Sequence, residues 1–383
     1  MSWRSVDVQE QRIRFVVLAS GAERSLSSLC AAFGISRATG HLWLKRYREG
    51  GVAAVVEQSR RPLASPRRTA AETEQRVIAL RRERPDWGAR KLAVLLGKEG
   101  VELPAATVHR ILNRHGLVRV EDRHAPALGR FEREEPNQLW QMDFKSPKGW
   151  GQPVGPLSVI DDRSRYAITL FQTGTTRTEA VREQLEQAFT RCGVPEAMLI
   201  DHGIPWWNGA SAGGWTQLTV WLMKQGVRLY LSGIRHPQTQ GKVERFHGAL
   251  EKARRLRGLP EPALRQRWLD DFRQDYNHVR PHEALGMQTP ASVWQPSPQP
   301  FDPDPAAWQY PEGAEVHRLE KTGQLTLNGR RWQVAGALAS EQVRLIRNQQ
   351  RILVFYRNTL LRELDLVMQG STMVEPCITK YLP

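Results

Sequence analysis

The middle of the chain alternates short apolar runs with stretches of helical periodicity, and this order restricts the folds open to it. Three consecutive apolar runs predict strands, at residues 138–145, 156–161 and 166–171. Two further runs, one ending at Asp201 and one at 227–231, are each preceded by a predicted helix. Strands that first follow one another and then alternate with helices indicate a mixed sheet with helices on its faces.

Three carboxylates stand out in this region. Asp143 lies inside the first apolar run, Asp201 ends a later one, and Glu244 lies in a stretch with helical periodicity. A carboxylate within or at the end of a buried strand is costly unless its charge is compensated. Divalent cations would compensate it, because carboxylate oxygens suit Mg²⁺ and a two-metal site can hold both the attacking and the leaving oxygen of a phosphoryl transfer. The alternative, three exposed charges in loops, is disfavoured because two of the three lie in apolar runs.

The composition indicates a polyanionic partner. The chain carries 55 Lys and Arg residues against 40 Asp and Glu residues, a formal net charge of +15. Together with the DNA-binding patterns described below, this charge favours nucleic acid over a merely solvated basic surface. No apolar run reaches the roughly 18 residues of a membrane span, so we expect no membrane partner. Cys30, Cys192 and Cys377 lie far apart, which argues against a disulfide framework and favours a reducing cytoplasm.

Residues 1–58 predict a helix-turn-helix. Ser25 and Ser36 can cap successive short helices, and Gly34 can form the turn between them. In this motif the second helix enters the major groove. Gly40 is unexpected inside that helix, because glycine costs about 1 kcal/mol there. The polar residues expected to face DNA are Arg37, His41 and Lys45. A small helical bundle without a ligand is the alternative.

Residues 70–120 repeat the theme with three predicted helices, and Gly116 lies where a helix should stop. Two adjacent modules would together cover a long DNA site. The residues of this second module expected to face DNA are Thr107, His109, Arg110 and Arg114.

A basic linker, residues 59–69, joins the two modules. Its prolines discourage a helix, and its paired arginines suit a narrow minor groove. These linker arginines are Arg60, Arg61, Arg67 and Arg68. A merely flexible, soluble linker is the alternative.

A second change of pattern marks the C-terminal part. A proline-rich stretch at 295–305 predicts a linker, and beyond it the apolar residues alternate with period two. Asn328-Gly329 is a strong signal for a hairpin turn. Residues 312–370 therefore predict a small β-barrel domain.

Four motifs resemble the superfamily of DDE transposases and retroviral integrases, and in particular bacterial insertion-sequence transposases with two N-terminal helix-turn-helix modules. They are WQMD at 140–143, IDDRSR at 160–165, DHG at 201–203 and HPQTQGKVERFH at 236–247. The resemblance implies a ribonuclease-H-like fold for residues 130–294, flanked by the all-α modules and the small β-barrel. It also places Asp143, Asp201 and Glu244 in a triad that binds two Mg²⁺ ions, for which Mn²⁺ could substitute.

The chain departs from the family in two places. The 42 residues between Asp201 and Glu244 exceed the usual spacing, and the extra length falls in a Trp-rich, Gly-rich loop at 206–215. Glu251 stands where many relatives have a basic residue. Within the motifs, Asp161 and Asp162 are interpreted as structural or turn residues. The first two tryptophans of the loop are interpreted as packing residues, with base stacking as the alternative.

The resemblance implies an enzyme that binds the terminal inverted repeats of a mobile element, cleaves DNA there and joins the 3′-OH ends to target DNA. Its partners would be double-stranded DNA and further copies of itself, at least a dimer on DNA, in the nucleoid region of a bacterial cytoplasm. Two alternatives remain: a DNA-binding regulator whose catalytic fold has decayed, and a metal-dependent nuclease that does not join strands.

Overall fold

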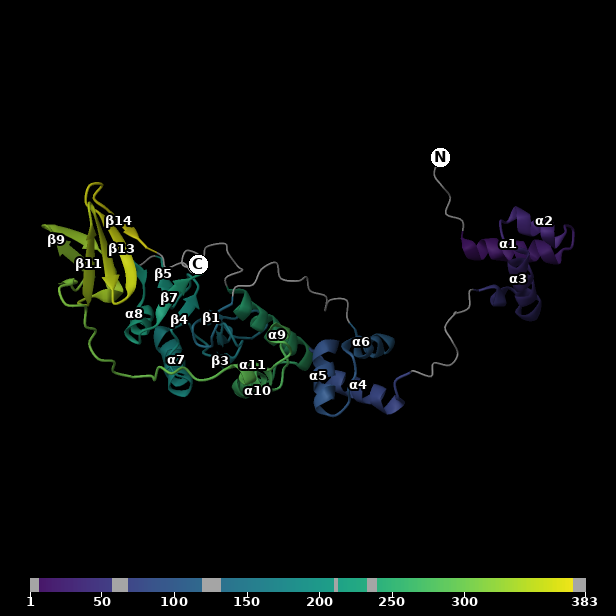
Figure 1. The fold of residues 1–383 in the computed structure, drawn as a ribbon, viewed down its shortest axis with the longest axis horizontal. Coiled ribbons are helices and arrows are strands. Elements are labelled where there is room, and N and C mark those ends of the chain that lie inside the picture. The colour runs from purple at the N-terminus through teal and green to yellow at the C-terminus, as the bar shows by residue number, and fades with distance from the viewer. Residues whose placement is uncertain (1–6, 57–67, 119–131, 210–212, 233–239, 375–383) are drawn as a thin grey trace. The chain divides into compact units, whose positions relative to one another are not determined.

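The structure is a computed structural model that describes residues 7–56, 68–118, 132–209, 213–232 and 240–374 (Figure 1). The chain divides into two compact units, Met1–Thr69 and Ala70–Pro383.

The first unit is a small helical module. Its helices are α1 (Val8–Ser20), α2 (Leu26–Ala32), α3 (Arg37–Gly50) and the short 3₁₀ helix η1 (Val52–Val55). The two predicted caps are confirmed, since Ser25 accepts a hydrogen bond from the Ser28 amide and Ser36 accepts one from the Thr39 amide. Gly34, between α2 and α3, has a φ of +63°, as a turn glycine requires.

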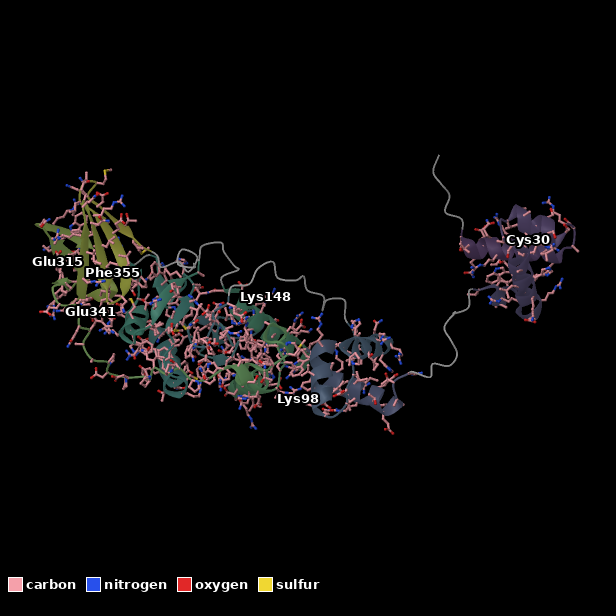
Figure 2. All side chains as sticks on the ribbon, in the orientation of Figure 1. Cys30, Lys98, Lys148, Glu315, Glu341 and Phe355 are labelled. Atoms are coloured by element: carbon pink, nitrogen blue, oxygen red, sulfur yellow. The ribbon has the colours of Figure 1, made fainter. Side chains whose placement is uncertain are left out.

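The packing of this module explains the unexpected Gly40. A Cβ atom at this position would lie 2.4 Å from Cys30 Sγ and 3.0 Å from the Phe15 ring. Both neighbours are buried in the centre of the module, and Cys30 is labelled in Figure 2. Close packing of α3 on the other two helices therefore requires glycine here and offsets its helix penalty.

The second unit begins with another three-helix module, formed by α4 (Ala71–Glu83), α5 (Ala89–Lys98) and α6 (Ala105–Arg114). Its core contains Trp87, Leu92 and Ile111, all fully buried. The predicted stop at Gly116 is confirmed: its φ is +66°, and the next amide, of Leu117, bonds back to the Leu112 carbonyl at 2.8 Å.

A five-stranded mixed sheet forms the centre of this unit. Its strands are β1 (Trp140–Phe144), β2 (Leu157–Asp161), β3 (Ala167–Phe171), β4 (Ala197–Ile200) and β7 (Arg228–Leu231). The order across the sheet is β3-β2-β1-β4-β7, with β1, β2 and β3 antiparallel and with β4 parallel to both β1 and β7. The predicted mixed sheet is thus confirmed.

Helices cover both faces of this sheet. They are α7 (Thr178–Cys192), α8 (Gln217–Lys224), α9 (Gly241–Arg257) and α10 (Arg265–His278). The short helix α11 (Pro290–Val293) packs on α10, and the 3₁₀ turns η4 (Pro262–Leu264) and η5 (Glu283–Leu285) lie in the connections. Alternate strand residues point to opposite faces, so Val159 packs in the core beneath α7 and α8 while Ile160 packs beneath α9 and α10. This is the mixed sheet with helices on both faces that the sequence predicts for this part of the chain.

The second helical module contacts the end of α9 through a buried ion-pair network. Asp86 lies between α4 and α5, and its two oxygens accept hydrogen bonds from Arg257, at 2.6 Å, and from Arg280, at 2.7 Å. Arg257 is the last residue of α9, and Arg280 follows α10. Arg84 adds an ion pair to Asp275 of α10.

The C-terminal part contains the predicted strands, but they do not close into the predicted barrel. The strands are β8 (Glu315–Arg318), β9 (Gln324–Leu327), β10 (Arg330–Gln333), β11 (Gln342–Asn348), β12 (Arg351–Tyr356), β13 (Thr359–Asp365) and β14 (Gly370–Met373), with the 3₁₀ turn η6 (Gly336–Leu338). Five of them form an open antiparallel sheet, ordered β14-β13-β12-β11-β8, while β9 and β10 form a separate hairpin around Asn328 and Gly329. A closed barrel is therefore not seen among the described residues.

The proline-rich stretch before this sheet also differs from a free linker. The Ser297 amide donates to the Cys192 carbonyl, and the Val194 amide donates to the Gln299 carbonyl, each at 2.8 Å. Phe301 lies 5.9 Å from the ring of Phe189 in α7. The stretch is therefore packed along the end of α7. Lys224 of α8 pairs with Glu341, which directly precedes β11 of the C-terminal sheet; Glu341 is labelled in Figure 2.

Within the ranges described, no helix is both long and apolar enough to cross a membrane.

Candidate active site

The fold brings the three predicted carboxylates to one edge of the central sheet. Asp143 is the fourth residue of β1, and Asp201 directly follows β4, the parallel neighbour of β1. The carboxyl ends of parallel neighbours meet at the same edge of a sheet. Glu244 lies in the first turn of α9, which packs on β1 and β2.

The electrostatics of Asp143 reflect this convergence. Burial is the largest influence and, with the negative charges of Asp201 and Glu244, it raises the pKa of Asp143 to about 7. A hydrogen bond from the Phe144 backbone and the charge of Lys145 oppose this shift without cancelling it. Like charges held near a half-buried carboxylate are the arrangement that a divalent cation would stabilise.

Asp201 is oriented by the loop that lengthens the chain before Glu244. Its Oδ1 atom accepts hydrogen bonds from the Gly203 amide, at 2.8 Å, and from the indole N–H of Trp206. The Trp206 ring stacks on Phe144, beside Asp143, with 5.4 Å between centroids. A Cβ atom at Gly203 would lie 2.9 Å from Asp201 Oδ1, so glycine suits this close approach.

The packing role predicted for the Trp-rich loop is confirmed, because Trp206, Trp207 and Trp215 are buried. Two short strands, β5 (Trp207–Asn208) and β6 (Gly214–Trp215), pair within this loop. The hydrogen bond from Trp206 to Asp201 is a further role that the sequence interpretation missed. Its one signal was the position of a tryptophan five residues after the aspartate.

His247, three residues after Glu244, is buried close to Asp143. Its Nε2 atom is 3.0 Å from Ser158 Oγ, and its Nδ1 atom is 3.7 Å from Asp143 Oδ2. Burial, with the charge of Lys145, lowers the pKa of His247 to about 3. The imidazole is therefore neutral at neutral pH and does not neutralise Asp143.

Asp161 and Asp162 are both fully buried. Asp161 accepts hydrogen bonds from the amides of Asn137 and Ser164, each at 2.7 Å, and from the Ser164 hydroxyl at 2.6 Å. The two bonds from Ser164 close the turn between β2 and β3, and the Asn137 bond ties this turn to the segment before β1. The interpretation of Asp161 as a structural or turn residue is thus confirmed. Asp162 instead accepts a hydrogen bond from Gln141 of β1 and pairs with Lys242 of α9.

The residues present fit a divalent metal site. Three carboxylates supply hard oxygen ligands, and burial, together with the charges of Asp201 and Glu244, raises the pKa of Asp143. Across the ranges that the structure describes, no group of three His, Cys, Asp or Glu side chains is already gathered at metal-binding distances.

Of the residues predicted to contact DNA, some are exposed and others form contacts within their own module. In the first module Arg37, His41 and Lys45 are all exposed along α3, at the spacing of one helix face. In the second module His109 and Arg110 are exposed. Three of the four linker arginines lie outside the described residues.

The other two residues of the second module form contacts within it. Thr107 accepts a hydrogen bond from Arg110 at 3.0 Å. Arg114 is paired with the buried Glu74 at 2.6 Å. Arg114 therefore compensates a buried charge in its own module.

Four family models match the chain. A helix-turn-helix domain matches residues 11–62, a homeodomain-like domain matches residues 39–112, and two integrase core domain models match residues 133–237 and 225–290. The integrase core matches contain Asp143, Asp201 and Glu244.

Two of the similar curated proteins are insertion-element proteins. The chain is 27% identical over 233 residues to the IS407 uncharacterized 31.7 kDa protein of Burkholderia multivorans, covering 56% of this chain and 78% of that protein. It is 23% identical over 274 residues to the IS476 uncharacterized 39.2 kDa protein of Xanthomonas euvesicatoria, covering 67% and 74% respectively.

Among solved structures, the HTLV-2 integrase catalytic core domain in complex with magnesium is 15% identical, with a TM-score of 0.34, covering 42% of this chain and 97% of that chain. A likeness this small adds nothing to the family matches.

Proposed function

This chain belongs to the insertion-element proteins that join helix-turn-helix modules to an integrase core domain, and from that premise we propose that it is a DDE transposase. It would bind the terminal inverted repeats of its element, cut the DNA there and join the 3′-OH ends to a target. The observation that carries this proposal is the convergence of Asp143, Asp201 and Glu244 at one edge of the central sheet. The charges of the last two add to burial in raising the pKa of Asp143.

Each carboxylate has a distinct place in the proposed mechanism. Asp143, on the central strand β1, would contribute to both metal positions, Asp201 to one and Glu244 to the other. When bound, two Mg²⁺ ions, or Mn²⁺ in their place, would lower the pKa of the attacking water or 3′-OH and would offset charge on the leaving oxygen. Trp206 and Gly203 hold Asp201 in place through their hydrogen bonds.

The basic N-terminal region would recognise the element ends. The exposed residues of α3 would contact the major groove, and His109 and Arg110 would do so from α6. The linker arginines would contact phosphates or the minor groove. In this proposal residues 1–58, 59–69 and 70–120 would bind DNA, residues 130–294 would form the catalytic domain, and residues 312–370 would form a β domain.

The active unit would be at least a dimer on DNA. Joining both ends of an element to one target requires two triads, because a single triad serves one end at a time. The test is the mass of the protein bound to end DNA, together with mixing of Asp143→Asn and a variant disabled in N-terminal DNA binding. Recovery of joining in the mixture supports cutting in trans; a one-subunit complex that joins both ends contradicts the dimer. Such a DNA substrate would place the protein at the bacterial nucleoid.

Isosteric substitution tests the catalytic proposal. Asp143→Asn, Asp201→Asn and Glu244→Gln should each abolish cleavage and joining while leaving end binding largely intact, because each removes a negative metal ligand and keeps its shape. Asp270→Asn is the matched control, since Asp270 lies on α10 with an exposed side chain. Robust joining by one of the three variants would remove that residue from the triad.

A further inference from the structure

The helix that carries Glu244 begins without a cap of its own. Gln240, at the N-cap position of α9, makes no side-chain hydrogen bond to the helix. The first amides of a helix have no partner within it and need one from elsewhere. The Val243 amide finds its partner on β1: it donates to Gln141 Oε1 at 3.2 Å. Val243 directly precedes Glu244, so this bond fixes the turn from which the glutamate projects.

The same strand therefore holds one triad carboxylate and the cap for another. Gln141 is fully buried on β1, two residues before Asp143. Residues two apart on a strand point to the same face. A buried hydrogen bond thus connects the β1 segment of Asp143 with the α9 turn of Glu244.

Asp162 sets the orientation of the Gln141 amide. Its Oδ1 atom accepts a hydrogen bond from Gln141 Nε2 at 2.9 Å. An ionised carboxylate can only accept hydrogen bonds, so the NH₂ group of Gln141 must face Asp162 and its oxygen must face Val243. The orientation that caps α9 is therefore the one that the carboxylate imposes.

Asp162 also reaches the first turn of α9 directly. Its Oδ2 atom lies 2.5 Å from Lys242 Nζ, and the same oxygen accepts a hydrogen bond from the Arg133 amide at 2.8 Å. The Asp162 side chain is fully buried, and the Lys242 side chain is 12% exposed. The buried charge is thus paired, as burial requires, and the pairing adds a second tie beside Glu244.

We propose that Gln141 and Asp162 are positioning residues for catalysis: together they hold the first turn of α9 against β1 and thereby set the place of Glu244 relative to Asp143. The proposal rests on the proposed function, in which these two carboxylates hold metal. Removing the partners of metal ligands changes metal affinity or activity by about 10- to 100-fold, because a site that is roughly 1 Å too loose works poorly.

A series of nearly isosteric variants of the full chain tests this role. Gln141→Glu sets two carboxylates against each other. The double variant Gln141→Glu with Asp162→Asn restores a donor facing an acceptor, with the direction of the bond reversed and the net charge unchanged. Gln141→Met removes the bond without adding charge, so it keeps the test open if Gln141→Glu does not fold. Gln172→Met is the matched control, because Gln172 bonds to Gln152 and Val154 away from α9.

Two quantities should be measured for each variant, with thermal unfolding recorded alongside. One is Mn²⁺ binding, followed through the electron paramagnetic resonance signal of free Mn²⁺ in the presence of a DNA duplex. The other is the Mn²⁺ concentration that half-activates DNA cleavage. We expect Gln141→Met and Gln141→Glu to weaken Mn²⁺ binding about tenfold or more, and the double variant to recover much of the loss seen with Gln141→Glu. The Gln172→Met control should bind Mn²⁺ as the unsubstituted chain does.

Three outcomes overturn the role in positioning. They are unchanged Mn²⁺ binding in Gln141→Met, no recovery in a folded double variant, or a loss in Gln172→Met as large as in Gln141→Met. If the unsubstituted chain binds Mn²⁺ but cuts no DNA, the proposed function fails, and the binding measurement still decides whether Gln141 positions the site.

Discussion

Replacing Asp86 with alanine should loosen the second helical module from the helices that position Glu244. The Asp86 side chain has no exposed surface, and its partners Arg257 and Arg280 lie at the end of α9 and after α10. Burial alone would raise the pKa of Asp86, but the charges and hydrogen bonds of the two arginines lower it below its ordinary value. The carboxylate is therefore charged at neutral pH, and its removal leaves the guanidinium groups of Arg257 and Arg280 without their buried counter-ion.

The expected magnitude follows from the burial of those cations. Removing one partner of a buried ion pair costs about 3–5 kcal/mol, because the remaining charge is buried without compensation. The Arg280 side chain is 9% exposed and that of Arg257 is 25% exposed, so solvent relieves part of the cost. A value near 3 kcal/mol is therefore expected.

A surface pair in the same module supplies the control. Arg76 and Glu99 form a close pair at 2.6 Å, but both side chains are 36% exposed. Exposed pairs contribute about 0–1 kcal/mol, so Glu99→Ala should cost less than about 1 kcal/mol.

Hydrogen–deuterium exchange suits this comparison, because it reports local opening in a chain whose parts need not unfold together. Asp86→Ala should speed exchange in α4–α6 and at the ends of α9 and α10, while the central strands stay protected. Equal exchange in Asp86→Ala and Glu99→Ala would refute the reasoning.

Three further predictions concern other parts of the chain. Burial lowers the pKa of His282 to about 2, whereas in the unfolded chain this imidazole has its ordinary pKa of about 6.5. Below about pH 6.5 the unfolded chain therefore binds a proton that the folded chain does not, and the free energy of unfolding should fall by up to about 1.4 kcal/mol per pH unit. His282→Gln should flatten that decline in urea unfolding between about pH 6.5 and 4.5, and an unchanged decline would contradict the assignment. Trp206→Phe should slow cleavage about tenfold or more by removing the N–H that holds Asp201, whereas Trp215→Phe, whose indole N–H bonds to none of the described residues, should change the rate little; equal losses would argue against the Asp201 bond. Neutralising the linker arginines should weaken DNA binding and reduce the salt dependence by roughly 0.9 for each phosphate that these arginines neutralise; an unchanged slope would mean that the linker does not touch DNA.

The three carboxylates could be picked out from the sequence because two of them lie in apolar runs, but their assembly into one site was implied by the family resemblance. Element order alone leaves open whether the strand ending at Asp201 pairs with β1, as it does, or with β3. The supporting bonds were not accessible in the same way. In the sequence Asp86 is only a polar residue before a tryptophan. Its partners lie 171 and 194 residues away, so no local pattern indicates the contact.

The open C-terminal sheet, the packing of the proline-rich stretch and the packing around Gly40 could not be predicted from the sequence pattern either. Period-two alternation predicts strands in the C-terminal part, but barrel closure depends on strand tilt and stagger, which alternation does not encode. Prolines at 295–305 correctly predict the absence of regular structure there, yet they do not predict that the backbone bonds to Cys192 and Val194. Gly40 seemed unfavourable because helix propensity does not include the neighbouring Cys30 and Phe15.

Strand joining is the most direct test of the central claim. Purified full chain should be incubated with Mg²⁺, DNA carrying the element ends and a target plasmid, and the products sequenced across any new junction. The proposed transposase yields element 3′ ends covalently joined to target DNA, and Asp143→Asn yields none. Cut ends without any joined product would contradict the claim and identify a metal-dependent nuclease instead.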